Sequence, residues 1–432
     1  MARKNQKLTP EEIVSKIRSG DVIGSSLGNG NPYILYDALY ERRNELKDIS
    51  LSISLLVRPV KLLAGPARKA FTVKSDFMGP IEGRVFALGS TLDPQIIHLS
   101  RIPGDRYEGH VSNVIMLVAA PPDAEGNISF GVGPFDRKVI QKADMVVVQF
   151  NKKMPFIQSP DQMIHMRDVD YSCEWDEDLV YLPDITPTPA QKKIAELISE
   201  RIPDGACLQL GIGGQAGAFT EPLLGKKHLG VHTELYVDPF VDLTEKGVID
   251  NSRKNIDPGK SVFGFALGTK HMHDFLDHNP LVETRSFSYV NNPSVIAQID
   301  HFISVNSTLE VDLTGQACSE SFGLRQYSGT GGQLDFVRGA TASKGGQSYL
   351  TLPSTYRDKK TGEVHSRIRL MLTPGAAVTT PRADVQYICT EYGIADLRNA
   401  TIHERVQRMI AIAAPEFREQ LAFEAKKNGL LW

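Results

Sequence analysis

The hydrophobic positions of this chain alternate between short aliphatic runs and helical segments. The β-branched runs KADMVVVQF and HFISVNSTLEVDL are typical of buried strands, whereas residues 189–202 (PAQKKIAELISERI) have the apolar spacing of a helix. Strands that alternate with helices in this way predict a parallel or mixed sheet covered on both faces. We therefore predict an α/β fold.

Part of the pattern occurs twice. The segment GDVIGSSLGNGNPYILYDAL and the later segment GACLQLGIGGQAGAFTEPLL each predict a strand, a glycine loop and a helix. A weaker echo links DAEGNISFG with DLTGQACSESFG, since each ends a strand with a turn and a small polar stretch. Two such marks at nearly one offset predict a duplicated α/β half, because the repeats of a solenoid are far shorter. The matched positions are Gly20 and Gly205, Ile23 and Leu208, Leu27 and Ile212, Gly28 and Gly213, and Leu39 and Leu224.

A proline-rich linker, LPDITPTP, separates the two halves and precedes the helix at residues 189–202. We predict an N-terminal domain of residues 1–186 and a C-terminal domain of residues 187–432, which are two similar open α/β domains. Near the end, Thr401 and Glu404 have the spacing of a capping box, and Pro415 suits the first turn of the last helix.

The composition excludes several classes of partner. The chain has 41% apolar and 23% charged residues, which is ordinary for a globular protein. Its formal charge of -3 gives no electrostatic reason to expect nucleic acid or an anionic membrane as a binding partner. Its apolar runs, such as VIMLVAA, are far shorter than the roughly 18 residues of a membrane span. No signal peptide is expected, because no apolar segment follows the basic opening MARKNQK. The cysteines have no CxxC spacing and predict buried thiols in a reducing, cytoplasmic setting; they are Cys173, Cys207, Cys318 and Cys389.

The candidate chemistry centres on Glu234, which follows a strand, a glycine-rich loop and the short strand HLGVH. A carboxylate at such a strand end faces the cleft in which open α/β sheets bind ligands. The loop GIGGQAG is one residue longer than the dinucleotide fingerprint, and Glu234 lies about where an acid would hold a ribose. The residues alone leave three interpretations open: a nicotinamide dinucleotide site, a nucleophile that attacks a thioester, and a structural turn.

Three other segments carry weaker signals. The glycine-rich stretch Tyr327–Gly346 could supply backbone amides to an oxyanion hole or be a flexible surface loop, and its LDFV run has the composition of a strand. Asn291 and Asn292 precede a proline and could form a turn or donate to an oxyanion. The histidines of KHMHDFLDH lack a third ligand at metal spacing, so no metal is expected. No GxSxG elbow is present, so a serine hydrolase has no support.

Taken together, six segments resemble the acetyl-CoA hydrolase/transferase family of the class I CoA-transferases. The resemblance is strongest to the 4-hydroxybutyrate and butyrate CoA-transferase branch. It covers nearly the whole chain and is most specific in the second half. In the family's order, the segments are LQLGIG, LGVHTE, SYVNNP, SVNSTLEVDLTGQ, SGTGGQLDFVRGA with SKGG, and TEYGIADLR.

This resemblance implies CoA transfer between an acyl-CoA of the acetyl, butyryl, 4-hydroxybutyryl or succinyl type and a small carboxylic acid. Glu234 stands at the place of the family's nucleophile, Asn291 and Gly331 or Gly332 at those of its oxyanion donors. Coenzyme A would enter as substrate and product, with no metal, in a homodimer. Hydrolysis of acyl-CoA by the same Glu234 is the alternative within the family. Further contacts with CoA or substrate are expected from Gly28, Gly211, Gly213, Gly214 and Gln333.

Several positions depart from the family's usual pattern. The run Leu235–Pro239 replaces the usual Met-Ile-Ser-Asp after HTE, and Gly214–Gly217 replaces a run that ends in proline. Later in the chain, Asn399 and Ala414 replace a glycine and a histidine. The first two changes lie beside the nucleophile, so the acid used stays open and includes dicarboxylates such as itaconate. We expect Tyr33 and Tyr236 to shape the acyl pocket.

Overall fold

The computed structural model describes residues 3, 5–102, 112–183, 185–211 and 214–432, and the chain divides into two compact units. The predicted domain boundary at residues 186 and 187 stays a prediction. It lies close to the first change of unit, and two later segments of the chain return to unit 1. Unit 1 comprises Met1–Pro183, Val262–Val290 and Tyr327–Gly331, and unit 2 comprises Asp184–Ser261, Asn291–Gln326 and Gly332–Trp432.

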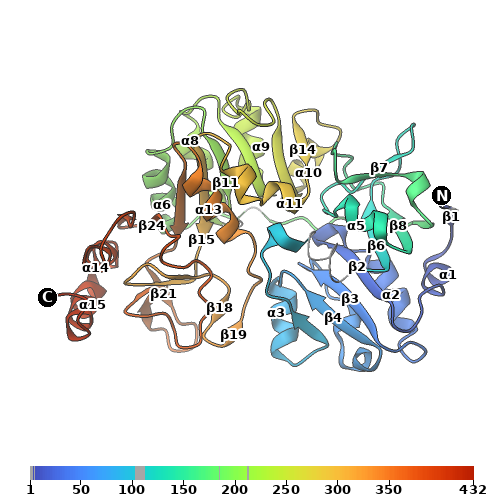
Figure 1. Cartoon of the computed structure of the whole chain (residues 1–432), viewed down its shortest axis with the longest axis horizontal. Coiled ribbons are helices and arrows are strands. Elements are labelled where there is room, and N and C mark those ends of the chain that lie inside the picture. Colours follow the sequence, from blue (N-terminus) through green and yellow to red (C-terminus); the bar gives the residue numbers. More distant parts are fainter. Residues whose placement is uncertain (1–2, 4, 103–111, 184, 212–213) are drawn as a thin grey trace. The chain divides into compact units, whose positions relative to one another are not determined.

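The described part of unit 1 contains a sheet of eight strands in which every neighbouring pair is parallel. Its order is β1-β10-β8-β6-β2-β3-β4-β5, and Figure 1 labels six of these strands, β1, β2, β3, β4, β6 and β8. Along β6, Ile115 and Leu117 pack in one hydrophobic cluster and Met116 in another, because successive strand residues point to opposite faces. Both faces are therefore covered, as predicted. The strands are β1 (Gln6–Lys7), β2 (Val22–Leu27), β3 (Ile49–Ser54), β4 (Phe71–Ser75), β5 (Leu92–Pro94), β6 (Val114–Ala119), β8 (Met145–Phe150) and β10 (Tyr171–Glu174).

Short helices and turns complete unit 1. Thr9 caps the first helix with a capping box, and Asp136 caps α5. The other strands in this part are β7 (Asn127–Ser129), β9 (Met163–His165), β13 (Ser261–Ala266) and β14 (Val282–Thr284). The helices are α1 (Pro10–Val14), α2 (Tyr33–Glu41), α3 (Pro80–Ala87), α5 (Arg137–Lys142), α10 (Lys270–Leu276) and α11 (Phe287–Val290), with 3₁₀ turns at Gly28–Gly30, Lys61–Leu63, Gly65–Lys69, Leu99–Arg101 and Met166–Asp168.

Six strands of unit 2 lie side by side in the order β12-β11-β15-β20-β24-β25. All these neighbours are parallel except β24 and β25, which are antiparallel. The six strands are β11 (Cys207–Leu210), β12 (Gly230–Tyr236), β15 (Phe302–Ser307), β20 (Gln347–Thr351), β24 (Tyr387–Thr390) and β25 (Gly393–Asp396). Shorter strands are β16 (Glu310–Asp312), β17 (Ala317–Cys318), β18 (Ser321–Phe322), β19 (Arg325–Gln326), β21 (Thr355–Arg357), β22 (Val364–Ser366) and β23 (Ile368–Arg369).

Three helices of unit 2 begin where the sequence pattern predicts. Thr188 caps α6, Thr401 and Glu404 form the predicted capping box of α14, and Pro415 stands in the first turn of α15. Helix α6 ends at Ser199, three residues before the predicted end. The helices are α6 (Pro189–Ser199), α7 (Gly214–Gly217), α8 (Thr220–Leu223), α9 (Asp238–Glu245), α12 (Pro293–Ile296), α13 (Gln333–Ala342), α14 (Ile402–Ala411) and α15 (Pro415–Lys427).

The two sheets share a strand order, which agrees with the predicted duplication. The parallel series β3-β2-β6-β8-β10 corresponds to β12-β11-β15-β20-β24. Gly20 and Gly205, which precede β2 and β11, both have positive φ, at 89° and 78°. Of the other matched positions, Leu39 is buried and Leu224 is 42% exposed, so this pair is not equivalent in the fold. Ile212 and Gly213 lie outside the described residues.

The weaker match, between DAEGNISFG and DLTGQACSESFG, corresponds to the same type of turn in both units. Asp123 and Asp312 each accept a backbone hydrogen bond from the residue four positions on, at 2.7 and 3.0 Å. The side-chain amides of Asn127 and Gln316 donate to the second carboxylate oxygen of each aspartate. A glycine with positive φ closes each turn, Gly126 in one and Gly315 in the other. The short polar stretches thus encode the same local structure in both units.

One prediction of secondary structure was wrong. The LDFV run, which has the composition of a strand, lies within α13, where Leu334, Asp335 and Phe336 are all buried. Tertiary packing decided this, because β-branched and aromatic residues suit a strand only when a neighbouring strand is available. The four cysteines are buried free thiols, as predicted. Among the described residues, no helix has the length and apolarity to cross a bilayer.

Candidate active site

Glu234 lies within the last three residues of β12, at the carboxyl edge of the unit 2 sheet. The parallel register pairs Cys207 with Gly230 and Leu208 with Val231, so β11 ends at the same edge and delivers Gly211 there. The strand runs to Tyr236 and is longer than the predicted HLGVH. Since ligands of open α/β sheets bind at the carboxyl ends of parallel strands, Glu234 occupies the expected place for chemistry.

Two donors from distant parts of the sequence hold the carboxylate of Glu234. The Asn291 amide donates to Oε2 of Glu234 across 2.6 Å, and the Gly332 backbone N–H is also hydrogen-bonded to this carboxylate. Asn291 is fully buried, so its amide is fixed by its surroundings. The structure therefore brings together three of the residues predicted for the site.

The backbone around these donors explains their positions. Asn292 caps α12 by accepting from the Ser294 N–H at 2.9 Å, with Pro293 in the first turn. This turn leaves the preceding Asn291 to face Glu234. Asn292 thus forms the predicted turn, and the oxyanion role of Asn291 stays a prediction. Gly332 caps α13 at its N-terminus. A Cβ atom at Gly332 would lie 2.1 Å from both Asn291 Nδ2 and Glu234 Oε2, so any other residue here would displace the two side chains of the site.

The carboxyl group of Glu234 titrates far above its ordinary range. Burial raises its pKa to about 7, against the hydrogen bonds from Asn291 and Gly332, which lower it. Asp335, in the first turn of α13, raises the pKa further by charge repulsion. Near neutral pH the group therefore exists in both forms, which is typical of carboxyl groups at functional sites.

Asp335 was missed in the sequence, although it lies in the GGQLDFV segment. The signal that could have identified it is its position three residues after Gly332. Residues three apart lie on the same face of a helix, so a helix that begins at Gly332 places Asp335 on the same side as this glycine. The wrong prediction of a strand at LDFV concealed this relation, because alternate strand residues would have faced opposite sides.

The other predicted contact residues lie in several places. Gly331 belongs to unit 1, has a φ of 67°, and accepts a hydrogen bond from the Leu99 N–H through its carbonyl. Gln333 opens α13 and donates to Thr380 at 2.9 Å. Gly28, also in unit 1, has a φ of 59° at the carboxyl end of β2. Gly214 begins α7, close to the Gln191 side chain, and Gly213 lies outside the described residues.

The two tyrosines that we expect to shape the acyl pocket are both buried, and this role stays a prediction. Tyr236 is fully buried and packs on Phe240. Tyr33 is 7% exposed and supports the Arg58 guanidinium, 4.0 Å above its ring. No group of histidine, cysteine, aspartate or glutamate suited to a metal occurs among the described residues.

Comparison with known proteins identifies the family. The model of the acetyl-CoA hydrolase/transferase N-terminal domain matches residues 3–182, and that of the C-terminal domain matches residues 268–425. A 4-hydroxybutyrate coenzyme A transferase of Clostridium kluyveri is 37% identical over 98% of this chain and 98% of its own. The chain belongs to the acetyl-CoA hydrolase/transferase family.

Further relatives agree with this assignment. A butyryl-CoA:acetate CoA-transferase of Anaerostipes caccae is 38% identical over 97% of this chain and 95% of its own. The crystal structure of RipA from Yersinia pestis superposes with a TM-score of 0.89 at 34% identity and covers 98% of each chain. Membership confirms the resemblance seen in the six sequence segments and the duplicated α/β fold. The dinucleotide-binding dehydrogenase finds no support in these relatives.

Proposed function

We propose that Glu234 is the residue through which this acyl-CoA:carboxylate CoA-transferase passes CoA from a donor to an acceptor acid. The observation that carries the proposal is the pair of donors on Glu234, one from Asn291 and one from Gly332. A carboxylate held in this way presents one oxygen to a reactant while its other oxygen stays in a site that favours negative charge.

The first step would be attack by the ionised Glu234 on the thioester carbonyl of acyl-CoA. Because Asn291 holds Oε2, we assign the attack to Oε1. The tetrahedral intermediate collapses with loss of the CoA thiolate, which leaves an anhydride between the acyl group and Glu234. No redox cofactor or ATP is needed, since the energy of the thioester is retained in the anhydride.

In the second step the CoA thiolate attacks the side-chain carbonyl carbon of Glu234. Negative charge then develops on Oε2, the oxygen to which Asn291 donates. Release of the first carboxylic acid leaves a glutamyl-CoA thioester. An acceptor carboxylate reverses both steps and departs as its own CoA ester. Loss of one such donor typically costs about 10²–10³ in rate.

The same residues would serve acyl-CoA hydrolysis if water reached the anhydride or the thioester. The full-length relatives described above are named as CoA-transferases, which favours transfer. Exclusion of water during the reaction would separate the two outcomes. The binding energy of the CoA moiety, remote from the reacting carbonyl, can be used to close and orient the site.

The test is mass spectrometry of the intact enzyme after incubation with acetyl-CoA alone, followed by peptide mapping. We expect a CoA adduct on the peptide that contains Glu234, and we expect an added carboxylic acid to remove it. Glu234→Gln should form no adduct and lose at least about 10³ of the transfer rate, because the nucleophile is absent. The control is Glu221→Gln, the same change in α8 of the same unit.

Retention of the adduct in Glu234→Gln, or an adduct on another peptide, would overturn the assignment of the nucleophile. Steady release of free CoA without an adduct would favour the hydrolase. The homodimer and the cytoplasmic location stay predictions from the sequence, as do substrate contacts by Gly28, Gly211, Gly214 and Gln333.

A further inference from the structure

A pocket lies wholly within unit 2, beyond the carboxyl ends of β15 and β20. Leu309 and Glu310 line it just after β15. Tyr356 and Arg357 line it from β21, the strand that follows β20. Its free volume is about 560 Å³, within the range of about 300–1,000 Å³ that is typical of small-molecule sites. Open α/β folds bind ligands at this edge of the sheet.

Positive charge prevails in the lining, so we name this site the basic pocket. Its cations are Arg357, Lys359, Arg367 and Arg369. Its acids are Glu310 and Asp358, and both already have partners. Glu310 pairs with Arg369 at 3.0 Å and accepts from the Thr373 hydroxyl at 2.8 Å. Asp358 accepts from the Lys360 backbone N–H at 2.6 Å within its own turn. The basic pocket therefore has a surplus of positive charge.

Arg367 lacks a counter-ion among the described residues. Its half-buried guanidinium donates to the carbonyl oxygens of Leu309 at 2.8 Å and Thr355 at 3.4 Å. Glu310 pairs with Arg369 instead. Burial lowers the pKa of Arg367, and the neighbouring charge of Arg369 also lowers it. Because a charge withdrawn from water is costly unless it is paired, this guanidinium favours an anion beside it.

Aromatic side chains line the same pocket. Phe322, in β18, is 52% exposed, and the Arg367 guanidinium lies 5.2 Å from the ring centre of Tyr356. Nucleic-acid bases stack on aromatic rings and on guanidinium planes whatever their sequence. A ligand that combines an anionic group with a planar ring can therefore use both parts of the lining.

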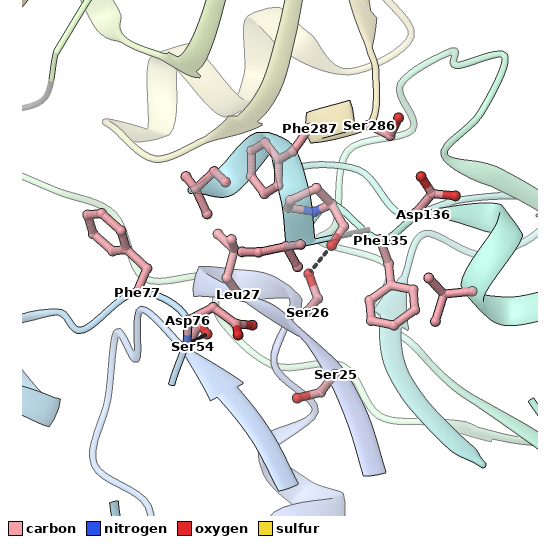
Figure 2. A pocket seen from close by; sticks show the side chains of 14 residues that line it. Ser25, Ser26, Leu27, Ser54, Asp76, Phe77, Phe135, Asp136, Ser286 and Phe287 are labelled. Atoms are coloured by element: carbon pink, nitrogen blue, oxygen red, sulfur yellow. Dashed lines mark hydrogen bonds between the residues drawn. The ribbon is translucent and has the colours of Figure 1, made fainter. Parts of the chain in front are cut away.

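The pocket at the corresponding edge of the unit 1 sheet is different. Ser26, Ser54 and Asp76 line it near the ends of β2, β3 and β4 (Figure 2). Its free volume is only about 40 Å³, and its described lining includes no lysine, arginine or histidine. Since the two sheets share a strand order, the fold by itself does not require cations at this edge. The basic pocket is a feature of unit 2, and an anionic ligand explains it.

The sheet of unit 2 relates the basic pocket to Glu234. The parallel registers of β12, β11 and β15, continued to the carboxyl edge, place Glu234 level with Gly211 and Asn306. Neighbouring strands lie about 4.8 Å apart, so β15 and β20 are roughly 10 and 14 Å from β12 along this edge. The pantetheine arm of CoA has the length of about four extended peptide residues, or about 14 Å. The two distances match.

We propose that the basic pocket binds a phosphorylated nucleoside, with a phosphate at Arg367 and the base against Phe322. A planar guanidinium holds two phosphate oxygens at once, which suits this role. The source that fits the spacing is the nucleotide end of CoA, and this assignment rests on the proposed transfer through Glu234. A free nucleotide has the same chemistry, so the experiment has an arm for each source.

The first measurement is binding of adenosine 3′,5′-bisphosphate to the full-length enzyme by isothermal titration calorimetry. We expect one site per chain, with an affinity that falls as salt is added. Arg367→Gln should raise Kd at least about tenfold, because it removes two charge-assisted hydrogen bonds. Lys359→Gln should raise Kd severalfold. Arg253→Gln is the control, since Arg253 is exposed and packs beside Gly205, before β11 at the opposite edge of the sheet; its Kd should equal that of wild type.

The second measurement compares acetyl-CoA with acetyl-pantetheine, which lacks the nucleotide, as donors for transfer. If the nucleotide end of CoA occupies the pocket, Lys359→Gln should raise KM for acetyl-CoA severalfold and reduce the preference for acetyl-CoA over acetyl-pantetheine. Arg253→Gln should keep this preference. Adenosine 3′,5′-bisphosphate should also compete with acetyl-CoA. Binding of the bisphosphate without such competition would overturn the assignment to CoA and identify a free nucleotide as the ligand.

The inference is wrong if wild-type enzyme does not bind the bisphosphate, or if wild type, Lys359→Gln and Arg367→Gln bind it equally. A CoA adduct on Glu234 in that case would leave the proposed function in place. Conversely, if the bisphosphate binds and the variants weaken it but no acyl-CoA gives an adduct, the pocket stands and the proposed function fails. Lys359 is exposed, so a folding defect in Arg367→Gln cannot hide the answer.

Discussion

At the scale of single residues, the environment of Glu234 acts on its pKa in both directions. Desolvation and Asp335 raise its pKa to about 7, while Asn291 and Gly332 favour the ionised form. A carboxylate with a raised pKa is a better nucleophile than an ordinary one, provided that it is ionised at the working pH. In the proposed mechanism, the two donors therefore serve the resting carboxylate and the later oxyanion with the same hydrogen bonds.

This balance predicts the pH dependence of the first step. Only ionised Glu234 attacks, so the rate of adduct formation should rise with pH and level off above about 7. Asp335→Asn removes the repulsion from a neighbouring carboxylate and should shift the midpoint to lower pH. The measurement is adduct formation from acetyl-CoA against pH.

Asp358→Asn, the same substitution in an exposed turn of unit 2, should leave the profile in place. An unchanged midpoint in Asp335→Asn would show that burial alone sets the pKa of Glu234.

At the scale of elements, the two units repeat a strand order and also a turn. Asp123 and Asp312 make corresponding hydrogen bonds with their turn residues, but their surroundings differ. Asp312 is 3% exposed and also accepts from the Thr314 hydroxyl at 2.8 Å, whereas Asp123 is half-buried. One sequence motif thus stabilises a partly exposed turn in one unit and a buried turn in the other.

Substitution of the two aspartates should separate these cases. Asp312→Ala leaves buried donors of Thr314 and Gln316 without an acceptor, and we expect a loss of about 3 kcal/mol in the free energy of unfolding. Asp123→Ala should cost clearly less, because water can replace the lost acceptor. Urea denaturation of both variants, followed by circular dichroism, would measure the difference; equal losses would contradict the role of burial.

At the scale of the whole molecule, the chain passes from unit 1 to unit 2 at the two residues that donate hydrogen bonds to Glu234. Val290 belongs to unit 1 and Asn291 to unit 2, and the same change occurs between Gly331 and Gly332. A division of the chain into two domains at residue 186 does not account for the two later segments, Val262–Val290 and Tyr327–Gly331, that belong to unit 1. The residues of the site are therefore contributed by segments that a sequence boundary would treat as interior to one domain.

Burial of Glu234 should also reduce the stability of the whole molecule. The pKa of Glu234 is about 7 in the folded protein and about 4.3 for an unperturbed glutamate, so the folded state binds the proton more tightly. The contribution of this group to stability is then present below about pH 4.3 and is lost as the pH rises through 7. Glu234→Gln should raise the unfolding midpoint at pH 8.5 by several degrees and change it little at pH 4.5.

Differential scanning calorimetry at both pH values would test this prediction. Glu221→Gln, in the same unit, should show no such difference between the two conditions. If Glu234→Gln is equally stable at both pH values relative to wild type, burial of Glu234 carries no cost in stability.

Much of this protein was determined by local sequence. The alternation of strands and helices, the capping of α6 and α14, the glycines with positive φ before β2 and β11, and the repeated aspartate turn all depend on residues close in the chain. Local rules suffice there because hydrogen bonds within a turn or a helix end are made by neighbours. The six family segments added Glu234, Asn291 and Gly332 as candidates.

Only the tertiary structure decided what these candidates contact. It turned LDFV into a helix, so that Asp335 affects Glu234, and it buried Tyr236 against Phe240. It also assembled a small pocket within unit 1 from residues at the ends of β2, β3 and β4 and from Phe287, which lies far away in the sequence. Pattern and spacing along the chain specify which face a residue takes, but a pKa or a pocket depends on charges and surfaces that the fold brings from distant segments.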